Sequence, residues 1–147
     1  MKKILITGGS GLLGSNIAKL VAPKFETTAT YYKNRIDLPG VAFIAVDLTR
    51  KEEADKISAL KPGLIIHTAA LTNIDYCEEN PKEAYNHNVL ASRNIAEAAK
   101  KAGAYLIHIS TYCGFDGKSG NYKEEDKTSP INVYGKTKLE AEQNVMS

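Results

Sequence analysis

The segment Thr7-Gly8-Gly9-Ser10-Gly11-Leu12-Leu13-Gly14 stands between an apolar run at residues 3–7 and a helical pattern at about residues 12–21. Gly9, Gly11 and Gly14 satisfy the spacing G-x-G-x-x-G, and Gly8, Gly11 and Gly14 satisfy the wider form G-x-x-G-x-x-G. Glycines at this spacing let the backbone approach a pyrophosphate, which then sits at the positive end of the helix. Because the segment lies between a strand and a helix, it predicts a dinucleotide site at Gly8, Gly11, Leu12, Leu13 and Gly14, with a plain tight turn as the alternative.

Outward from this segment, the chain alternates short apolar runs with helical patterns. We predict strands at 25–31, 42–46, 64–68 and 105–109, and helices at 52–60, from Asn80-Pro81 to about Lys101, and from Ser129-Pro130 to the C-terminus. Continuous apolar strands that alternate with helices are typical of a parallel sheet covered on both faces. The sequence therefore predicts an α/β fold, a doubly wound Rossmann-like sheet with strand order 3-2-1-4-5, in one dinucleotide-binding domain over residues 1–147.

Composition argues against several other classes of partner. Nineteen Lys and Arg against 17 Asp and Glu give a net charge of +2, too even for a nucleic-acid surface. No uncharged stretch is long and apolar enough for a membrane span, and the apolar run after Met-Lys-Lys is too short for a secretory segment. Cys77 and Cys113 give neither a disulfide framework nor a metal-ligand spacing. We therefore expect reduced thiols, no metal, no membrane contact and a cytoplasmic location.

The residues after the second predicted strand bear on the choice of cofactor. A site for NAD usually has Asp or Glu there to hold the ribose 2′-hydroxyl. The sequence instead reads Tyr31-Tyr32-Lys33-Asn34-Arg35, in which Lys33 and Arg35 are suited to a 2′-phosphate. The pattern favours NADP(H), with NAD(H) as the second choice and a solvated basic turn as the alternative. Asp47-Leu48, after the third strand, is placed either to cover the adenine or to form a turn.

Tyr134 and Lys138 stand at i and i+4 in the last predicted helix, so their side chains share one face. An ammonium beside a phenol lowers the phenol pKa, which suits the pair to proton exchange with a carbonyl or alcohol oxygen. Ser110 and Thr111 end the fifth strand, where a hydroxyl either bonds the same oxygen or caps the strand. Asn88, among apolar neighbours of the long helix, is either part of the cofactor site or a buried, satisfied amide.

These motifs resemble those of the extended short-chain dehydrogenase/reductase family. The resemblance covers the whole chain and rests on residues 7–14, His67-Thr-Ala-Ala70, Asn88-Val89, Ser110-Thr111 and Tyr134-x-x-x-Lys138. Within the family, the chain is most similar to the dTDP-4-dehydrorhamnose reductases, through Phe115-Asp-Gly117, Tyr122-x-Glu-Glu-Asp126 and Pro130-Ile-Asn-Val-Tyr-Gly135.

The resemblance implies an enzyme that reduces the 4-keto group of a nucleotide-activated deoxysugar with NADP(H). By position, Tyr134 would donate a proton to the keto oxygen, Lys138 would lower the Tyr134 pKa and bind the nicotinamide ribose, and Thr111 would polarise the keto group. The cofactor channel would also include Ala69, Ala70 and Leu71.

Two departures from this subgroup matter. Its reductases usually read Ser-Thr-Asp-Tyr-Val-Phe-Asp-Gly after the fifth strand, whereas this chain reads Ser110-Thr-Tyr-Cys-Gly-Phe-Asp-Gly117, with Tyr112 in place of the Asp. This change bears on sugar positioning rather than on cofactor binding. Family members also continue into another strand and a C-terminal substrate-binding portion, so we expect an exposed edge strand and either a second copy or a complementing C-terminal segment as partner. The alternative is a non-catalytic dinucleotide-binding regulatory subunit, resembling the methionine adenosyltransferase β subunit.

Overall fold

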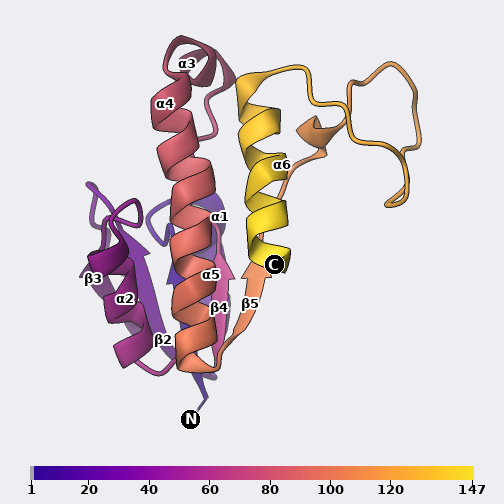
Figure 1. Ribbon diagram of the computed structural model, residues 1–147. Helices are drawn as coiled ribbons and strands as arrows, with labels where there is room; N and C mark the ends of the chain where they lie inside the picture. Colours follow the sequence, from indigo (N-terminus) through magenta and orange to yellow (C-terminus); the bar gives the residue numbers. More distant parts are fainter. Residues whose placement is uncertain (1) are drawn as a thin grey trace.

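The computed structural model describes residues 2–147, and its sheet has five parallel strands (Figure 1). The central strand β1 (Lys3–Thr7) pairs with β2 (Glu26–Tyr31), which pairs with β3 (Val41–Ala45). On its other side β1 pairs with β4 (Leu64–His67), which pairs with β5 (Tyr105–His108). The predicted order 3-2-1-4-5 is therefore confirmed, and the direction of winding reverses between β1 and β4. In open α/β sheets, ligands bind beside such a reversal, at the carboxyl ends of the strands.

Apolar side chains fill both faces of the sheet, which is why its strands are continuously apolar. On one face, Leu5 and Ile65 pack with residues of α2 (Lys51–Ala59) and α5 (Ala91–Ala102). On the opposite face, Ile4, Ile6 and Ile66 pack with α1 (Leu12–Val21). Figure 1 shows α2 and α5 in front of the sheet and α1 behind it.

The predicted helix from Asn80 to Lys101 is one rod of three parts. It comprises α4 (Pro81–Ala84), a π-helical turn η1 (Tyr85–Leu90) and α5. A short helix that the sequence reasoning missed, α3 (Ile74–Glu79), precedes it. Asn80 does not cap α4 as predicted, because its Nδ2 donates instead to the Tyr76 carbonyl at 3.2 Å.

The last helix, α6 (Val133–Met146), lies alongside α5 (Figure 1). Between β5 and α6 run a 3-10 turn, η2 (Tyr112–Gly114), and the loop at 115–132. The helix begins after the predicted Ser129-Pro130, because Asn132 caps it: Asn132 Oδ1 accepts from the Gly135 N–H at 2.7 Å. β5 forms the edge of the sheet, with Tyr105 82% and Ile107 48% exposed. Within the described chain, no helix combines the length and apolarity that crossing a membrane requires.

Candidate cofactor and catalytic site

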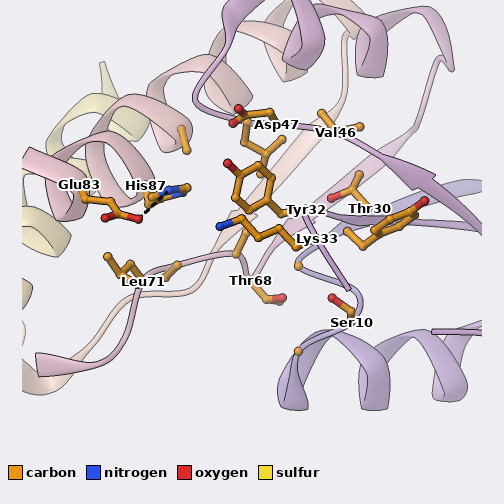
Figure 2. A pocket seen from close by; sticks show the side chains of 17 residues that line it. Ser10, Thr30, Tyr32, Lys33, Val46, Asp47, Thr68, Leu71, Glu83 and His87 are labelled. Atoms are coloured by element: carbon orange, nitrogen blue, oxygen red, sulfur yellow. Dashed lines mark ion pairs between the residues drawn. The ribbon is translucent and has the colours of Figure 1, made fainter. Parts of the chain in front are cut away.

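A cleft of about 360 Å³ opens at the carboxyl ends of β1, β2, β3 and β4, where the winding of the sheet reverses. Figure 2 shows side chains from these strand ends and from the α4–η1–α5 rod around it. The predicted cofactor residues that line it are Gly8, Gly11, Tyr32, Lys33, Asp47, Leu48, Ala69, Ala70 and Leu71. It is also lined by Ser10, Thr30, Tyr31, Val46, Thr68, Glu83, His87 and Ala91, which the site prediction did not include.

The glycine loop between β1 and α1 forms one wall of this cleft. Gly8 has φ +66°, and a Cβ there would lie 2.8 Å from the Ala69 Cα, so no side chain fits without moving backbone. A Cβ on Gly14 would overlap the Gly8 carbonyl, so α1 and the loop pack without space for one. Among the described residues, no side chain caps α1, which leaves its first-turn N–H groups available to an anion. The loop therefore has the close backbone packing and the uncapped N–H groups that could hold a pyrophosphate.

Leu12, Leu13 and Gly14 do not line the cleft themselves. Leu12 is 86% exposed on the first turn of α1, and Gly14 is buried against the loop. Their expected contribution is therefore the backbone at the start of the helix, rather than a side chain against the cofactor.

After β2, only one of the two predicted basic residues faces the cleft. Lys33 lines it, with Nζ 5.1 Å from the centroid of the Tyr32 ring, and that ring lies 5.5 Å from the His87 ring at a tilt of 60°. Arg35 lies outside the cleft and pairs with Asp37 at 2.9 Å. In this structure an acid two residues further on engages the guanidinium, and Arg35 does not join Lys33 at the cleft.

Asp47 lies at the cleft and also forms a turn. It lines the cleft, and its Oδ1 also accepts from the Thr49 N–H at 3.0 Å and the Thr49 hydroxyl at 2.7 Å, which closes a turn. Leu48 lines the cleft beside it, while the Leu48 carbonyl accepts from Asn94 Nδ2 at 2.9 Å. These bonds fix the end of β3 against α5.

A buried histidine anchors the wall that follows β4. Ser92 Oγ donates to the Asn88 carbonyl at 2.6 Å, so it must accept from His67 Nε2–H at 3.1 Å. His67 Nδ1 is then the acceptor for the Thr7 hydroxyl at 2.6 Å. Burial, with the nearby His108 and Lys138, holds the His67 pKa well below its usual value. His67 is therefore a neutral link between β1, β4 and α5.

Asn88 is a buried amide with its polar atoms satisfied, and it is absent from the cleft lining. Its Oδ1 accepts from the Leu71 N–H at 2.8 Å, and its Nδ2 lies 3.1 Å from the Leu71 carbonyl. The same Nδ2 donates to Thr137 Oγ1 at 3.0 Å. Asn88 therefore ties a cleft-lining residue to α6, which carries Tyr134 and Lys138.

Thr111, Tyr134 and Lys138 form a second group, next to the carboxyl end of β5 and outside the lining of the cleft. A close approach brings α6 to this strand end: a Cβ on Gly135 would overlap the Cys113 carbonyl. Lys138 is only 2% exposed, and its Nζ donates to the Ile109 carbonyl at 2.7 Å. The structure brings these three residues to one strand end through the Gly135–Cys113 contact, which the sequence did not indicate.

The pKa values of the pair differ from the expectation. Burial raises the pKa of Tyr134, and the nearby Thr111 hydroxyl opposes that rise only in part. Burial lowers the pKa of Lys138 to about 8, against a smaller opposing effect of Glu142. Lys138 is not among the groups that shift the Tyr134 pKa here, and its ammonium donates to the Ile109 carbonyl. A poised ammonium and a protonated phenol remain suited to donating a proton to an oxygen.

The sequence pattern matches the family model described as RmlD substrate binding domain over residues 1–147. A dTDP-4-dehydrorhamnose reductase of Aggregatibacter actinomycetemcomitans is 37% identical over all of this chain and 48% of its own length. The methionine adenosyltransferase 2 subunit beta of Bos taurus is 36% identical over 99% of this chain and 43% of its own. The chain thus spans about half the length of the curated relatives it matches.

Solved structures agree with these relationships. A hypothetical dTDP-4-dehydrorhamnose reductase from Sulfolobus tokodaii is 41% identical, with a TM-score of 0.88 over 98% of this chain and 51% of that one. The Bacillus anthracis dTDP-4-dehydrorhamnose reductase in complex with NADP is 30% identical, with a TM-score of 0.85 over 99% of this chain and 50% of that one. Bordetella bronchiseptica WbmG in complex with NAD and UDP is 27% identical, with a TM-score of 0.85 over 97% of this chain and 48% of that one. The match over its full length shows that this chain belongs to the RmlD substrate-binding domain family.

Proposed function

We propose that this chain is the cofactor-binding half of an NADP(H)-dependent reductase that acts on the 4-keto group of a nucleotide-activated deoxysugar, of the dTDP-4-dehydrorhamnose type. Residues 1–147 would form its dinucleotide-binding domain. The observation that carries the proposal is the Asn88 link, which fixes the glycine-walled cleft and the Tyr134–Lys138 helix in one frame. A cofactor and a proton donor must share such a frame for hydride and proton to reach one carbonyl.

Each residue has a defined task in this proposal. The backbone of the Gly8–Gly14 loop and the start of α1 hold the pyrophosphate, and Lys33 meets the 2′-phosphate. The bound nicotinamide would supply the hydride. Tyr134 donates a proton to the keto oxygen, Thr111 bonds the same oxygen, and Lys138 holds the nicotinamide ribose and lends positive charge to the reaction site.

The cofactor and partners follow from the same residues. The relatives include structures with NADP and with NAD. The lysine at the end of β2, without an acid lining the cleft at that strand end, favours NADP(H) here, with NAD(H) as the alternative. The sugar nucleotide would bind beyond Thr111 with help from a complementing C-terminal segment or a second copy. Two free cysteines, Cys77 and Cys113, fit a reaction in the cytoplasm.

A second candidate function is a non-catalytic dinucleotide-binding regulatory subunit, similar to the methionine adenosyltransferase 2 subunit beta. Tyr112 favours it, because this side chain is 86% exposed at the position where the resembled reductases have Asp. In that case the cleft would bind the cofactor without turnover.

Calorimetric titration with NADPH and NADH tests the cofactor proposal, using Lys33→Ala and, as matched control, Arg35→Ala. A lost charge-assisted bond to phosphate corresponds to a roughly tenfold or greater weakening. We expect Lys33→Ala to weaken NADPH binding by this amount and NADH binding much less, and Arg35→Ala to change neither. Equal weakening of both cofactors by Lys33→Ala would contradict the 2′-phosphate role.

Turnover separates the two candidate functions. NADPH oxidation would be followed with dTDP-4-dehydrorhamnose and a co-expressed C-terminal segment of a relative. We expect activity from the wild-type chain, and loss of it with unchanged NADPH affinity in Tyr134→Phe. NADPH binding without oxidation by the wild-type pair would favour the regulatory subunit.

A further inference from the structure

His108 ends β5 and contacts the buried ammonium of Lys138 directly. Its Nε2 lies 3.3 Å from Lys138 Nζ, which also donates to the Ile109 carbonyl at 2.7 Å. These are two acceptors for an ammonium that has three N–H groups. His108 has no task in the proposed reaction.

The hydrogen bond fixes which nitrogen of His108 carries its proton. An ammonium only donates, so Nε2 must accept and the proton must reside on Nδ1. Nδ1 is buried and has no hydrogen-bond partner among residues 2–147. A buried polar atom without a partner is unfavourable. Within residues 2–147, the contact with Lys138 is therefore the one hydrogen bond of this ring, and it selects the tautomer.

The neighbouring groups leave His108 neutral. Burial, with the nearby Lys138 charge, lowers the His108 pKa to about 4. His67 of β4, whose ring lies 5.3 Å away, is the opposite tautomer and is neutral too. On α6, Tyr134 lies one turn before Lys138, and Glu142, which accepts from the Ser110 hydroxyl, lies one turn after it. Thus the neutral ring of His108 contacts the Lys138 ammonium directly. Glu142, the carboxylate near Lys138, also accepts a hydrogen bond from Ser110.

We propose that His108 is a positioning residue for Lys138: as a neutral, Nδ1-protonated ring it holds the ammonium at the end of β5 and leaves its third N–H for the cofactor. This inference rests on the proposed function for the role of Lys138, whereas the tautomer and the contact stand on geometry alone. A side chain that merely fills space at this position would give no preference for either tautomer.

The first test is an NMR measurement on the wild-type chain. Two-bond ¹⁵N–¹H correlation spectra show which imidazole nitrogen is protonated. Near pH 7, we expect His108 protonated at Nδ1 and His67 protonated at Nε2. His108 protonated at Nε2 would overturn the proposal without any variant being made.

The second test compares His108→Gln with His108→Phe. The glutamine oxygen can replace Nε2 as acceptor, whereas phenylalanine keeps a ring without one. Because an acceptor favours the charged form, its loss should move the Lys138 titration below the wild-type value of about 8, by about one pH unit. We expect this shift in ¹³C-labelled lysine spectra of His108→Phe, and a near wild-type titration in His108→Gln. Ile107→Ala, on the opposite side of the strand, is the matched control and should titrate like the wild type.

The outcomes separate this inference from the proposed function. An unchanged Lys138 titration in His108→Phe, or equal shifts in both His108 variants, would overturn the positioning role even if NADPH binds. If His108→Phe does not fold, the wild-type tautomer and the His108→Gln titration still decide. With the role confirmed, NADPH affinity should weaken above about pH 8 in the wild type and at lower pH in His108→Phe. Absence of NADPH binding alongside the expected spectra would instead refute the proposed function.

Discussion

Lys138→Met should remove a pH dependence of stability that a single buried ammonium gives to this fold. The side chain is 2% exposed, and its pKa falls from 10.5 to about 8 on folding. Between these two values the unfolded chain holds the proton more tightly than the folded chain does. Stability therefore rises with pH through this window, and below about pH 8 the full cost of burying the charge is present.

The fall in the Lys138 pKa determines how much the stability changes with pH. A fall of about 2.5 pH units, at 1.36 kcal/mol each, corresponds to about 3 kcal/mol. Methionine removes that cost but leaves the Ile109 carbonyl and His108 Nε2 without their donor, which together cost about 2–6 kcal/mol at every pH. At pH 7 the variant should thus lie between about 1 kcal/mol more stable and about 3 kcal/mol less stable than the wild type. As the pH approaches 10.5 the wild type should gain about 3 kcal/mol relative to it.

Urea unfolding of both proteins at pH 7, 8, 9 and 10 measures this difference, since His67 and His108, whose pKa values the Lys138 charge lowers, stay neutral in the folded protein over this range. Lys136→Met, an exposed change two residues earlier on α6, is the matched control and should follow the wild type at every pH. Parallel curves for the wild type and Lys138→Met would refute the claim that burial of Lys138 destabilises the fold. If the variant instead gains stability relative to the wild type between pH 7 and pH 10, the predicted direction of the pH dependence is wrong.

Three further changes test other contacts. Gly14→Ala should weaken NADPH binding at least about tenfold by calorimetry, because its Cβ would push against the Gly8 carbonyl and displace the phosphate loop; unchanged affinity would contradict this packing. Gly135→Ala should destabilise the chain by about 1–3 kcal/mol in urea, since its Cβ overlaps the Cys113 carbonyl at the β5–α6 junction, and unchanged stability would show that the junction is looser than the structure indicates. Lowering the pH below about 6.5 should destabilise the wild type, because folding holds His67 neutral while the unfolded chain takes up the proton. His67→Gln should lose less stability between pH 7 and pH 5, and equal losses would contradict a buried, neutral His67.

The sequence predicted the elements whose pattern is repeated along several residues. The five strands, the first helix at 12–21 and the strand order follow from apolar runs and the glycine loop, so they emerged within one or two residues. Short-range competition was harder to foresee. Asn80 stands at the start of α4 but bonds the Tyr76 carbonyl instead of capping, and Asn132 rather than Ser129 caps α6. Local hydrogen bonds among neighbouring residues decide which cap forms.

The sequence predicted the site well at positions where only glycine fits. It predicted the site less well at polar side chains that can bond several different partners. Gly8 and Gly14 have space for nothing larger, so their pattern gave the loop directly. Arg35 had Asp37 within reach, and Asn88 had the Leu71 backbone, and in both cases the internal partner engages the side chain. His87 reaches the cleft from a helix more than 50 residues after Lys33, and only the folded arrangement brings them together.

The π-helical turn at Tyr85–Leu90 has a consequence for the geometry of the whole site. In this turn the Ala91 N–H bonds the Asn86 carbonyl, five residues back instead of four, so the rod contains one residue more than an α-helix of the same length. One residue corresponds to about 100° of rotation. Deleting a single residue here would restore a regular helix and turn everything before it by that angle relative to α5. Glu83 would swing out of the cleft wall while the core side of α5 stayed in place. The extra residue therefore sets the angular phase between the part of the rod that faces the cofactor cleft and the part that packs on the sheet.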